Sequence, residues 1–196
     1  MDKRIINNVL NSKILKELQS IATILYIFGV GIGMLFNYYK YMEFGINIFD
    51  YATILDFLIA PFADFKIIFF TLVTFLITWL IYRLDVIWKR YHPASYSRFS
   101  FNLTKFSWYK TLESFFSIIV FIVYLFVSAT IYGKVSKKVS LSQTEVSIRF
   151  NDNETISGQM IGRAGNTIFL LQDNAVKAIP SSSSMKELTY PITTIN

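Results

Sequence analysis

The chain has 196 residues, of which 53% are hydrophobic, and its 19 lysines and arginines outnumber 13 acidic residues to give a net charge of +6. This composition excludes a large soluble catalytic domain, because the apolar stretches leave about 60 residues for one extramembrane unit, which is near the lower size limit for an independent core. The lack of cysteine excludes disulfides, thiolate metal sites and cysteine nucleophiles.

Residues 1–17 are predicted to form an amphipathic helix that rests on the membrane surface, with apolar side chains roughly on one side and lysines elsewhere. Residues 18–39 carry no charge and are long enough to cross a bilayer, so we predict an uncleaved first membrane span there. Within this span, Gly29 and Gly33 form a small-xxx-small pair, a spacing that lets helix backbones approach closely. The pair is expected to pack helices within one subunit or between subunits.

Residues 44–63 are apolar except for polar side chains at every third position from Asn47 to Asp56. This pattern favours a helix that lies in the membrane interface and ends near Pro61, and the alternative is a re-entrant or spanning segment. Asp50 and Asp56 are candidate ion or interface carboxylates. They are expected to point to water, to attract cations beside a pore mouth, or to mark an ion path within the membrane.

A second span is predicted over residues 66–88, with the helix continuing until Pro93. Thr71, Thr74 and Thr78 recur at i, i+3 and i+7, which places one weakly polar stripe along this helix. Such hydroxyls bond back to carbonyls of their own helix or cross to a neighbouring helix. In an assembly of several copies, the stripe could instead line a water-filled pore.

Residues 94–110 form a loop in which aromatic and basic side chains are interleaved. Such a pattern can bind single-stranded nucleic acid by stacking, but beside two membrane spans it indicates an interfacial belt. Nucleic acid is therefore not an expected partner, whereas the lipid bilayer and its anionic lipids are. His92, the single histidine, is expected to interact with helix-end carbonyls or lipid head groups. The basic residues expected to contact head groups are Lys89, Arg90, Arg98, Lys105 and Lys110.

A third span is predicted over residues 113–133, because the twenty residues between Glu113 and Lys134 are uncharged. This span repeats both features of the earlier ones, a hydroxyl stripe that could line a pore and a small-residue pair that packs helices. The stripe consists of Ser117, Tyr124 and Ser128, and the pair consists of Ala129 and Gly133.

The composition changes after the third span, and residues 135–196 are predicted to form a small all-β domain. Partial alternation over residues 139–150 and three further β-branched runs, separated by glycines and turn residues, indicate short strands with tight connections. Strands of this length favour a small closed or partly open barrel.

The order of these features resembles an Sm-like barrel, such as the β domain of the small-conductance mechanosensitive channels. The resemblance is carried by Gly158 in a bent strand, Thr167 to Leu171 as the next strand, the Asp173-Asn174 hairpin turn, and Ile179-Pro180-Ser181, which close the unit. The chain departs from those channels because no large α/β domain follows and the third span lacks their glycine-alanine ridge. The resemblance therefore implies a fold and suggests channel function. The overall plan also resembles small multi-span effector and accessory proteins of bacterial antiviral defence.

The distribution of basic residues leaves open which side of the membrane carries the β domain. With three spans, the N-terminus and the 83–113 loop, with four and six basic residues, lie on one side, which puts the β domain outside the cytoplasm. The Sm-like resemblance implies a cytosolic barrel and so the reverse orientation. A fourth span through residues 44–63 would return the tail to the N-terminal side but would place the basic 83–113 loop outside the cytoplasm.

The sequence contains none of the motifs HExxH, GxSxG and GxxxxGK[ST], so no catalytic residue, cofactor or metal ligand is assigned and no enzyme is expected. We expect a homo-oligomeric, multi-pass protein of a bacterial inner membrane that acts as a channel or pore-forming effector. The alternative is a membrane anchor or accessory subunit that recruits a partner protein, such as one encoded in the same operon, through its β domain or its basic aromatic loop.

Overall fold

The computed structural model describes residues 3–101, 103, 106, 108–181 and 185–190, and within them it leaves out the side chains of residues 3–13, 110 and 114. This part of the chain is mostly helical and ends in one five-stranded antiparallel sheet. The helices are α1 (Lys3–Met42), the 3-10 helix η1 (Ile48–Asp50), α2 (Ile54–Ala63), α3 (Phe65–Tyr91), α4 (Pro93–Phe99) and α5 (Tyr109–Leu141). The strands are β1 (Val146–Phe150), β2 (Thr155–Ala164), β3 (Thr167–Gln172), β4 (Ala175–Pro180) and β5 (Met185–Thr189).

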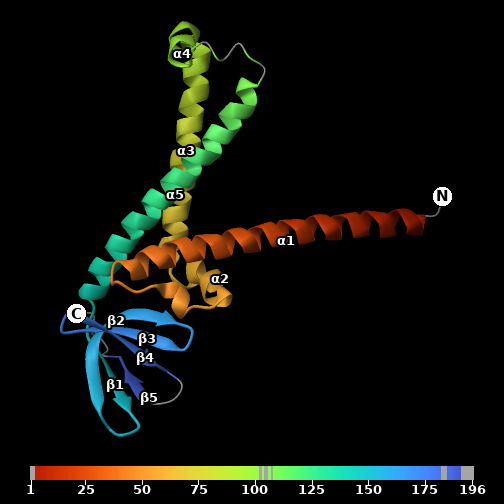
Figure 1. The fold of residues 1–196 in the computed structure, drawn as a ribbon. Coiled ribbons are helices and arrows are strands. Elements are labelled where there is room, and N and C mark those ends of the chain that lie inside the picture. The colour runs from red at the N-terminus through yellow and green to blue at the C-terminus, as the bar shows by residue number, and fades with distance from the viewer. Residues whose placement is uncertain (1–2, 102, 104–105, 107, 182–184, 191–196) are drawn as a thin grey trace, which may run out of the picture.

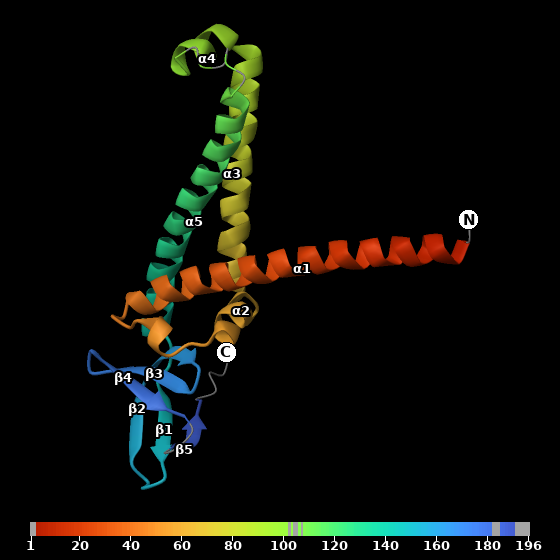
Figure 2. The ribbon, with the colours of Figure 1, turned by 45° about the vertical axis from the view of Figure 1, so that its right-hand side comes forward.

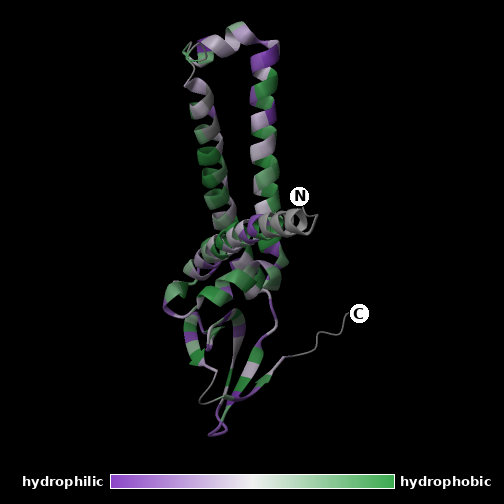
Figure 3. Cartoon of the chain, turned by 90° about the vertical axis from the view of Figure 1, so that its right-hand side faces the viewer, coloured by the Kyte–Doolittle hydropathy of each residue, from purple (hydrophilic) through white to green (hydrophobic). Residues whose placement is uncertain are grey.

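Three helices among the described residues are long and apolar enough to cross a membrane, judged by length and composition. The qualifying stretches are Ile14–Met42 in α1, Phe65–Tyr91 in α3 and Thr111–Leu141 in α5. In their most apolar windows 6%, 11% and 12% of the residues are buried within the chain, so few of their apolar residues are covered by the rest of the protein. Figure 3 shows that hydrophobic residues recur along the helices of the hairpin. A monomeric soluble protein rarely leaves so large an apolar surface uncovered.

The long helices do not form a parallel bundle. α3 runs from α2 to α4 and α5 returns beside it, so the two form a hairpin with α4 at its tip (Figures 1 and 2). α1 crosses this hairpin near its base, and the N-terminal part of α1 projects away from the rest of the described chain. The predicted surface helix over residues 1–17 and the predicted first span are continuous in α1, because no proline or glycine lies between them.

This crossing bears on the prediction of three spans. If α3 and α5 crossed a flat bilayer, α1 would lie along the surface of that bilayer near the base of the hairpin, because α1 runs across the hairpin in both views (Figures 1 and 2). Each of the three helices is long enough to cross a bilayer, but in this arrangement they cannot all cross the same flat one.

The segment predicted as one interfacial helix over residues 44–63 is divided. Gly45 adopts a positive φ of 72° in the turn after α1, η1 follows, and α2 begins after Thr53. Thr53 caps α2 through a capping box with Asp56, in which each side chain accepts a hydrogen bond from the other residue's backbone N–H. Pro61 lies inside α2, which ends two residues later at Ala63, so this helix ends near Pro61 as predicted.

α5 continues past the predicted end of the third span as far as Leu141, so the prediction of a strand beginning at residue 139 is wrong there. Ser136 and Ser140 are both buried, and their spacing of four residues is that of one helix face. The predicted strand is present from Val146 onward as β1. The helix predicted to continue until Pro93 ends at Tyr91, with His92 as its C-cap, as expected. The aromatic loop that follows contains a helix that was not predicted, because Pro93 also begins α4.

The strands pair in the order β4-β3-β2-β1-β5. The first half of β2 pairs with β1, with Val146 opposite Gly158, and its second half pairs with β3 from Gln159 onward. An irregularity between Met160 and Gly162 accompanies this change of partner. The bend predicted at Gly158 therefore corresponds to the region where β2 stops pairing with β1 and begins to pair with β3, and the irregular pairing extends as far as Gly162.

Two further features concern the ends of the sheet. Asp173 and Asn174 form the predicted turn between β3 and β4, with φ values of 49° and 64°. β5 pairs with β1 and was not predicted, because its exposed and half-buried residues show no regular apolar alternation. Within the described residues no pairing joins β4 to β5, so the sheet has two edges and closure of a barrel is not observed.

Candidate functional site at the helix–sheet junction

The sheet is joined to the helices by a shared apolar core, which we call the junction cluster. Tyr41 and Tyr51 direct their rings edge-on at Phe169 of β3, with centroid separations of 5.5 and 5.0 Å. The Tyr41 hydroxyl also donates to the main-chain carbonyl of Arg163 at 3.2 Å, which ties the end of α1 to β2. The buried members of the cluster are Tyr41, Ile46, Ile48, Phe57, Ile161, Ala164 and Phe169.

A polar cavity of about 390 Å³ lies beside this cluster, between α1, the α2–α3 connection, α5 and β2. We call it the junction cavity. Its lining contains three basic and two acidic side chains, contributed by segments that are far apart in the sequence. The charged and phenolic residues of the lining include Lys40, Asp56, Asp64, Lys66, Tyr132 and Arg163.

The two carboxylates of the junction cavity are held by hydrogen bonds from the protein. Asp64 caps α3, accepting from the Lys66 backbone N–H at 3.1 Å and from the Tyr132 hydroxyl at 2.9 Å. Asp56 accepts from the backbone N–H and the hydroxyl of Thr53, both at 2.7 Å, and from the backbone N–H of Gly165 at 3.3 Å. The bond to Gly165 links α2 to the β2–β3 turn.

These contacts change the acidity of Asp56. Partial burial acts to raise the pKa of this carboxyl, but hydrogen bonds from Thr53 and Gly165, together with the nearby charge of Arg163, outweigh burial and hold the pKa below its ordinary value. Asp56 is therefore an anion over the physiological pH range.

The basic side chains of the cavity have fewer protein partners. Lys40 is half-buried, and its Nζ lies 5.3 Å from the ring centroid of Tyr41. Arg163 donates from Nε to the carbonyl of Gly165 at 3.2 Å. The ion pairs formed in the described part of the chain are Lys89–Glu113 and Arg149–Glu187, and neither involves this cavity. Most donor groups of the three basic side chains are thus left for solvent or a ligand.

A second cavity of about 330 Å³ lies at the tip of the hairpin, between α3, α4 and α5. Its lining is mainly apolar, with a polar cluster in which the Tyr96 hydroxyl donates to Asp85 at 3.3 Å and lies 3.1 Å from the Tyr109 hydroxyl. Burial, and the hydrogen bond with Tyr109, raise the pKa of Tyr96 above its ordinary value. Lys89 pairs with Glu113 at 3.1 Å beside this cluster.

The predicted hydroxyl stripes are satisfied largely within the helices. Thr71, Thr74 and Thr78 donate to the carbonyls four residues earlier at 2.7 to 2.9 Å, and Thr74 is buried between α3 and α5. Ser117 donates to the carbonyl of Glu113, and Ser128 crosses from α5 to the Phe70 carbonyl of α3 at 3.2 Å. Tyr124 is exposed. The structure brings together Thr78 and Ser117, which both line the tip cavity.

The small-residue pairs lie against neighbouring elements of the same chain. A Cβ on Gly29 would be 3.4 Å from Leu58, and Gly33 lies directly against the main-chain carbonyl of Phe57. Ala129 is buried among the helices, and a Cβ on Gly133 would be 2.6 Å from the carbonyl of Tyr39.

The remaining predicted site residues are dispersed. Asp50 is exposed in η1, accepts from Asn47 at 3.0 Å, and does not line the junction cavity as Asp56 does. Among the expected head-group contacts, Lys89 is engaged with Glu113, whereas Arg90 and Arg98 are exposed near the hairpin tip. Lys105 and the side chain of Lys110 lie outside the described residues. Among the described residues, no group of three or more metal-ligating side chains occurs.

The junction cavity was not predicted from the sequence, and four of its charged residues, Lys40, Asp64, Lys66 and Arg163, were not selected as site residues. A local signal existed for Asp64 alone, since an acidic residue directly before an apolar helix is typical of an N-cap. Comparison of the chain with family models, with curated proteins and with solved structures gave no match.

Proposed function

We propose that this chain is a non-enzymatic subunit of a homo-oligomeric membrane channel or pore-forming effector. In this proposal α3 and α5 cross the bilayer as a hairpin, and α1 lies along the boundary on the side of the sheet. The observation that carries the proposal is the exposure of α1, where every residue from Ile14 to Phe28 is exposed.

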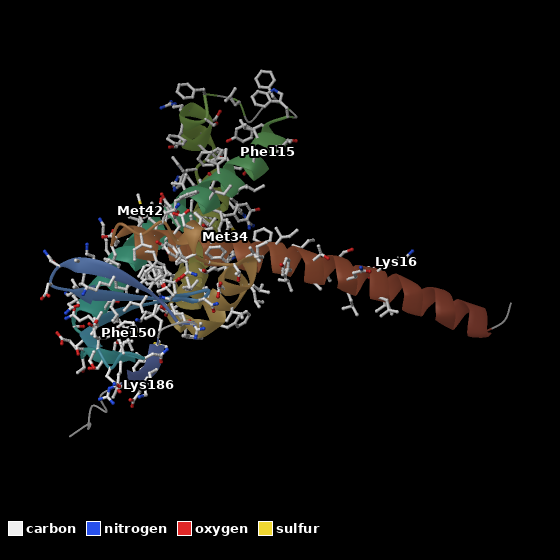
Figure 4. All side chains as sticks on the ribbon, turned by 60° about the horizontal axis from the view of Figure 1, so that its bottom comes forward. Lys16, Met34, Met42, Phe115, Phe150 and Lys186 are labelled. Atoms are coloured by element: carbon white, nitrogen blue, oxygen red, sulfur yellow. The ribbon has the colours of Figure 1, made fainter. Side chains whose placement is uncertain are left out.

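The projecting part of α1 exposes apolar side chains that a lipid surface alone would not cover. Its large exposed side chains include the consecutive residues Ile24, Leu25, Tyr26 and Ile27, which point to different sides of the helix, so apolar groups are exposed all around it. A helix lying along a membrane boundary buries one side in lipid, which leaves the other sides uncovered. Met34 lies where α1 meets the rest of the molecule, whereas Lys16 lies far out on the projection (Figure 4). Neighbouring copies of the chain would supply the missing cover.

The attachment of the sheet supports a role in gating. The junction cluster joins β2 and β3 to α1, η1 and α2, so a displacement of the sheet would be transmitted to the base of the hairpin. The antiparallel sheet, with β2 bent where it changes partner, also supports the proposal that this domain is Sm-like. The resemblance in overall plan supports a place in the inner membrane of a bacterium and a role in antiviral defence.

Extraction and mass measurement test the proposal most directly. The full chain would be purified in mild detergent, its mass measured under native conditions, and the same preparation placed in planar bilayers for current recording. We expect a discrete oligomer that conducts ions. A monomer without conductance would contradict the proposal.

A membrane anchor that recruits a partner protein is the second candidate. It is favoured by the edges of β4 and β5, which no described strand covers, because an exposed edge can accept a strand from a partner. The buried, internally bonded Thr74 also favours an anchor over a threonine-lined pore. In the same native mass measurement, an anchor would appear as a single copy that retains a second polypeptide.

A further inference from the structure

We propose that the junction cavity is a binding site for a phosphate-bearing anion, recognised by Lys40, Lys66 and Arg163. This site lies at the opposite end of the hairpin from the basic residues at the tip. The proposal goes beyond pore formation and does not depend on it, since the cavity is formed within one copy of the chain.

The first argument is the balance of charge in the cavity. Three basic side chains face two carboxylates, so the lining has a net charge of +1 when all five are ionised. None of the three basic residues forms an ion pair within the described part of the chain. An added anion would therefore be attracted, whereas an added cation would meet a net repulsion.

The second argument concerns which hydrogen-bonding groups are already engaged. Asp56 accepts three hydrogen bonds and Asp64 accepts two, all from protein donors. By contrast, the one hydrogen bond that the structure gives to the three basic side chains is that from Arg163 Nε to Gly165. The cavity thus offers donors and few acceptors, so its ligand must supply several acceptor oxygens.

A phosphate group meets these requirements better than a single carboxylate. It presents several acceptor oxygens around one centre, can accept two parallel bonds from a guanidinium, and is also bound well by lysine as a point charge. The volume of about 390 Å³ is within the range of small-ligand pockets and exceeds what one phosphate needs, so the ligand is a phosphate ester with further atoms.

Two sources of such a ligand share this chemistry. In the proposed arrangement the cavity lies at the membrane boundary, where the head group of an anionic phospholipid could enter it. A soluble phosphate ester could enter from the side of the sheet. The experiment is designed to distinguish the two sources.

The thermal unfolding midpoint of the full chain in a maltoside detergent would be measured with two probes, each at constant ionic strength. The soluble probe is inorganic phosphate, compared with chloride. The lipid probe is phosphatidylglycerol added to the micelles, compared with diacylglycerol, which lacks phosphate. A ligand that binds the folded chain raises the midpoint in a concentration-dependent way.

The variants are Lys40→Gln and Arg163→Gln, with Lys177→Gln as the matched control, because Lys177 is exposed on β4 and remote from the cavity. We expect the probe that raises the wild-type midpoint to bind each cavity variant with about tenfold lower affinity. Its affinity for the Lys177→Gln control should equal that for the wild type. Lys40→Arg keeps the positive charge, so this variant should retain binding. It tests the site in the case that Lys40→Gln does not fold.

Each outcome has a defined meaning. A shift with phosphatidylglycerol alone that is lost in the cavity variants supports a lipid head group, and a shift with inorganic phosphate that is lost in the same variants supports a soluble ester. Absence of any shift with either probe would overturn the proposal. So would a shift that survives in both cavity variants, or one that Lys177→Gln weakens as much as they do. Ion conductance is not a readout of this experiment, so failure of the pore proposal would not affect its result.

Discussion

Gly33 of α1 lies directly against the main-chain carbonyl of Phe57 in α2. Pro61, four residues after Phe57, has no N–H to donate to that carbonyl, so α2 leaves it without its helical hydrogen bond. The bare Cα of Gly33 can approach this oxygen, which lacks its helical hydrogen bond, closely enough for a weak Cα–H···O contact. The proline of one helix and the glycine of the other thus define a single close crossing.

The first prediction is that Gly33→Ala destabilises the chain. A Cβ at this position would overlap the Phe57 carbonyl, which is backbone and cannot rotate away, so we expect a loss of about 1–3 kcal/mol in the free energy of unfolding. The measurement is the chemical or thermal unfolding of the purified protein in detergent. Gly31→Ala is the matched control, because a Cβ on Gly31 meets nothing within 4 Å and alanine favours a helix by up to about 1 kcal/mol. Equal stability of the two variants would contradict the close crossing.

The second prediction concerns Tyr132, whose buried hydroxyl donates to Asp64 at 2.9 Å. Tyr132→Phe keeps the ring, which packs against Phe36 and Phe70, but leaves the N-cap carboxylate of α3 without one donor. We expect a loss of about 1–3 kcal/mol in the free energy of unfolding. Tyr124→Phe removes a hydroxyl from an exposed position of the same helix, and its stability should remain within about 0.5 kcal/mol of wild type. If the two substitutions have the same effect, the bond from Tyr132 to Asp64 does not stabilise the fold.

The extent to which the sequence predicts the fold differs between local and long-range features. Uncharged apolar runs indicate the long helices, and the Asp173-Asn174 pair indicates its turn, because both signals depend on neighbouring residues. The placement of the sheet against α1 depends on contacts such as that of Tyr41 with Arg163, 122 residues apart. No periodicity within either segment encodes such a contact.

The same distinction explains the candidate site. Lys40 and Lys66 each stand beside an apolar helix, where a lysine ordinarily reaches for the membrane surface. Their common cavity becomes apparent once α1 and α3 are placed with β2, which brings Arg163 beside them. The threonine stripe illustrates the converse case, because Thr74 has the spacing of a pore lining but is buried between two helices of one chain.

The third prediction is a dependence of stability on pH that arises from Asp56. Because the pKa of Asp56 is lower in the folded chain than its ordinary value of 3.8, its stabilising effect is complete above that value and is lost as the pH falls through the folded pKa. The unfolding midpoint of the wild type should therefore fall on acidification below about pH 4. Asp56→Asn cannot titrate and should show a smaller fall over the same range.

The control for this titration is Asp50→Asn. Asp50 bonds to Asn47 within its own turn, whereas Asp56 bonds to Gly165 across the helix–sheet junction. The acid-induced fall of Asp50→Asn should match that of the wild type. An equally large fall in Asp56→Asn would show that acid acts through another carboxylate.

The fourth prediction concerns the turn between β3 and β4, where Gln172 pairs with Ala175 and the two residues between them both have positive φ. This is the geometry of a type I′ turn, for which Asp-Gly is a preferred sequence. Asn174, at a φ of 64°, tolerates the left-handed region less well than glycine does. Asn174→Gly should therefore raise the free energy of unfolding by about 0.5 kcal/mol, and Asn174→Val should lower it by about 1–2 kcal/mol.

Asn166, in the turn between β2 and β3, provides the control, because its backbone is not left-handed. Glycine at that position gains no conformational advantage in the folded chain and increases the freedom of the unfolded chain, so Asn166→Gly should lower stability. Both variants remove one asparagine side chain. If Asn174→Gly raises the free energy of unfolding and Asn166→Gly lowers it, the difference must come from the backbone geometry at the two positions and not from loss of the side chain. If Asn166→Gly and Asn174→Gly changed stability in the same direction, the left-handed geometry at Asn174 would not be what limits the stability of this hairpin.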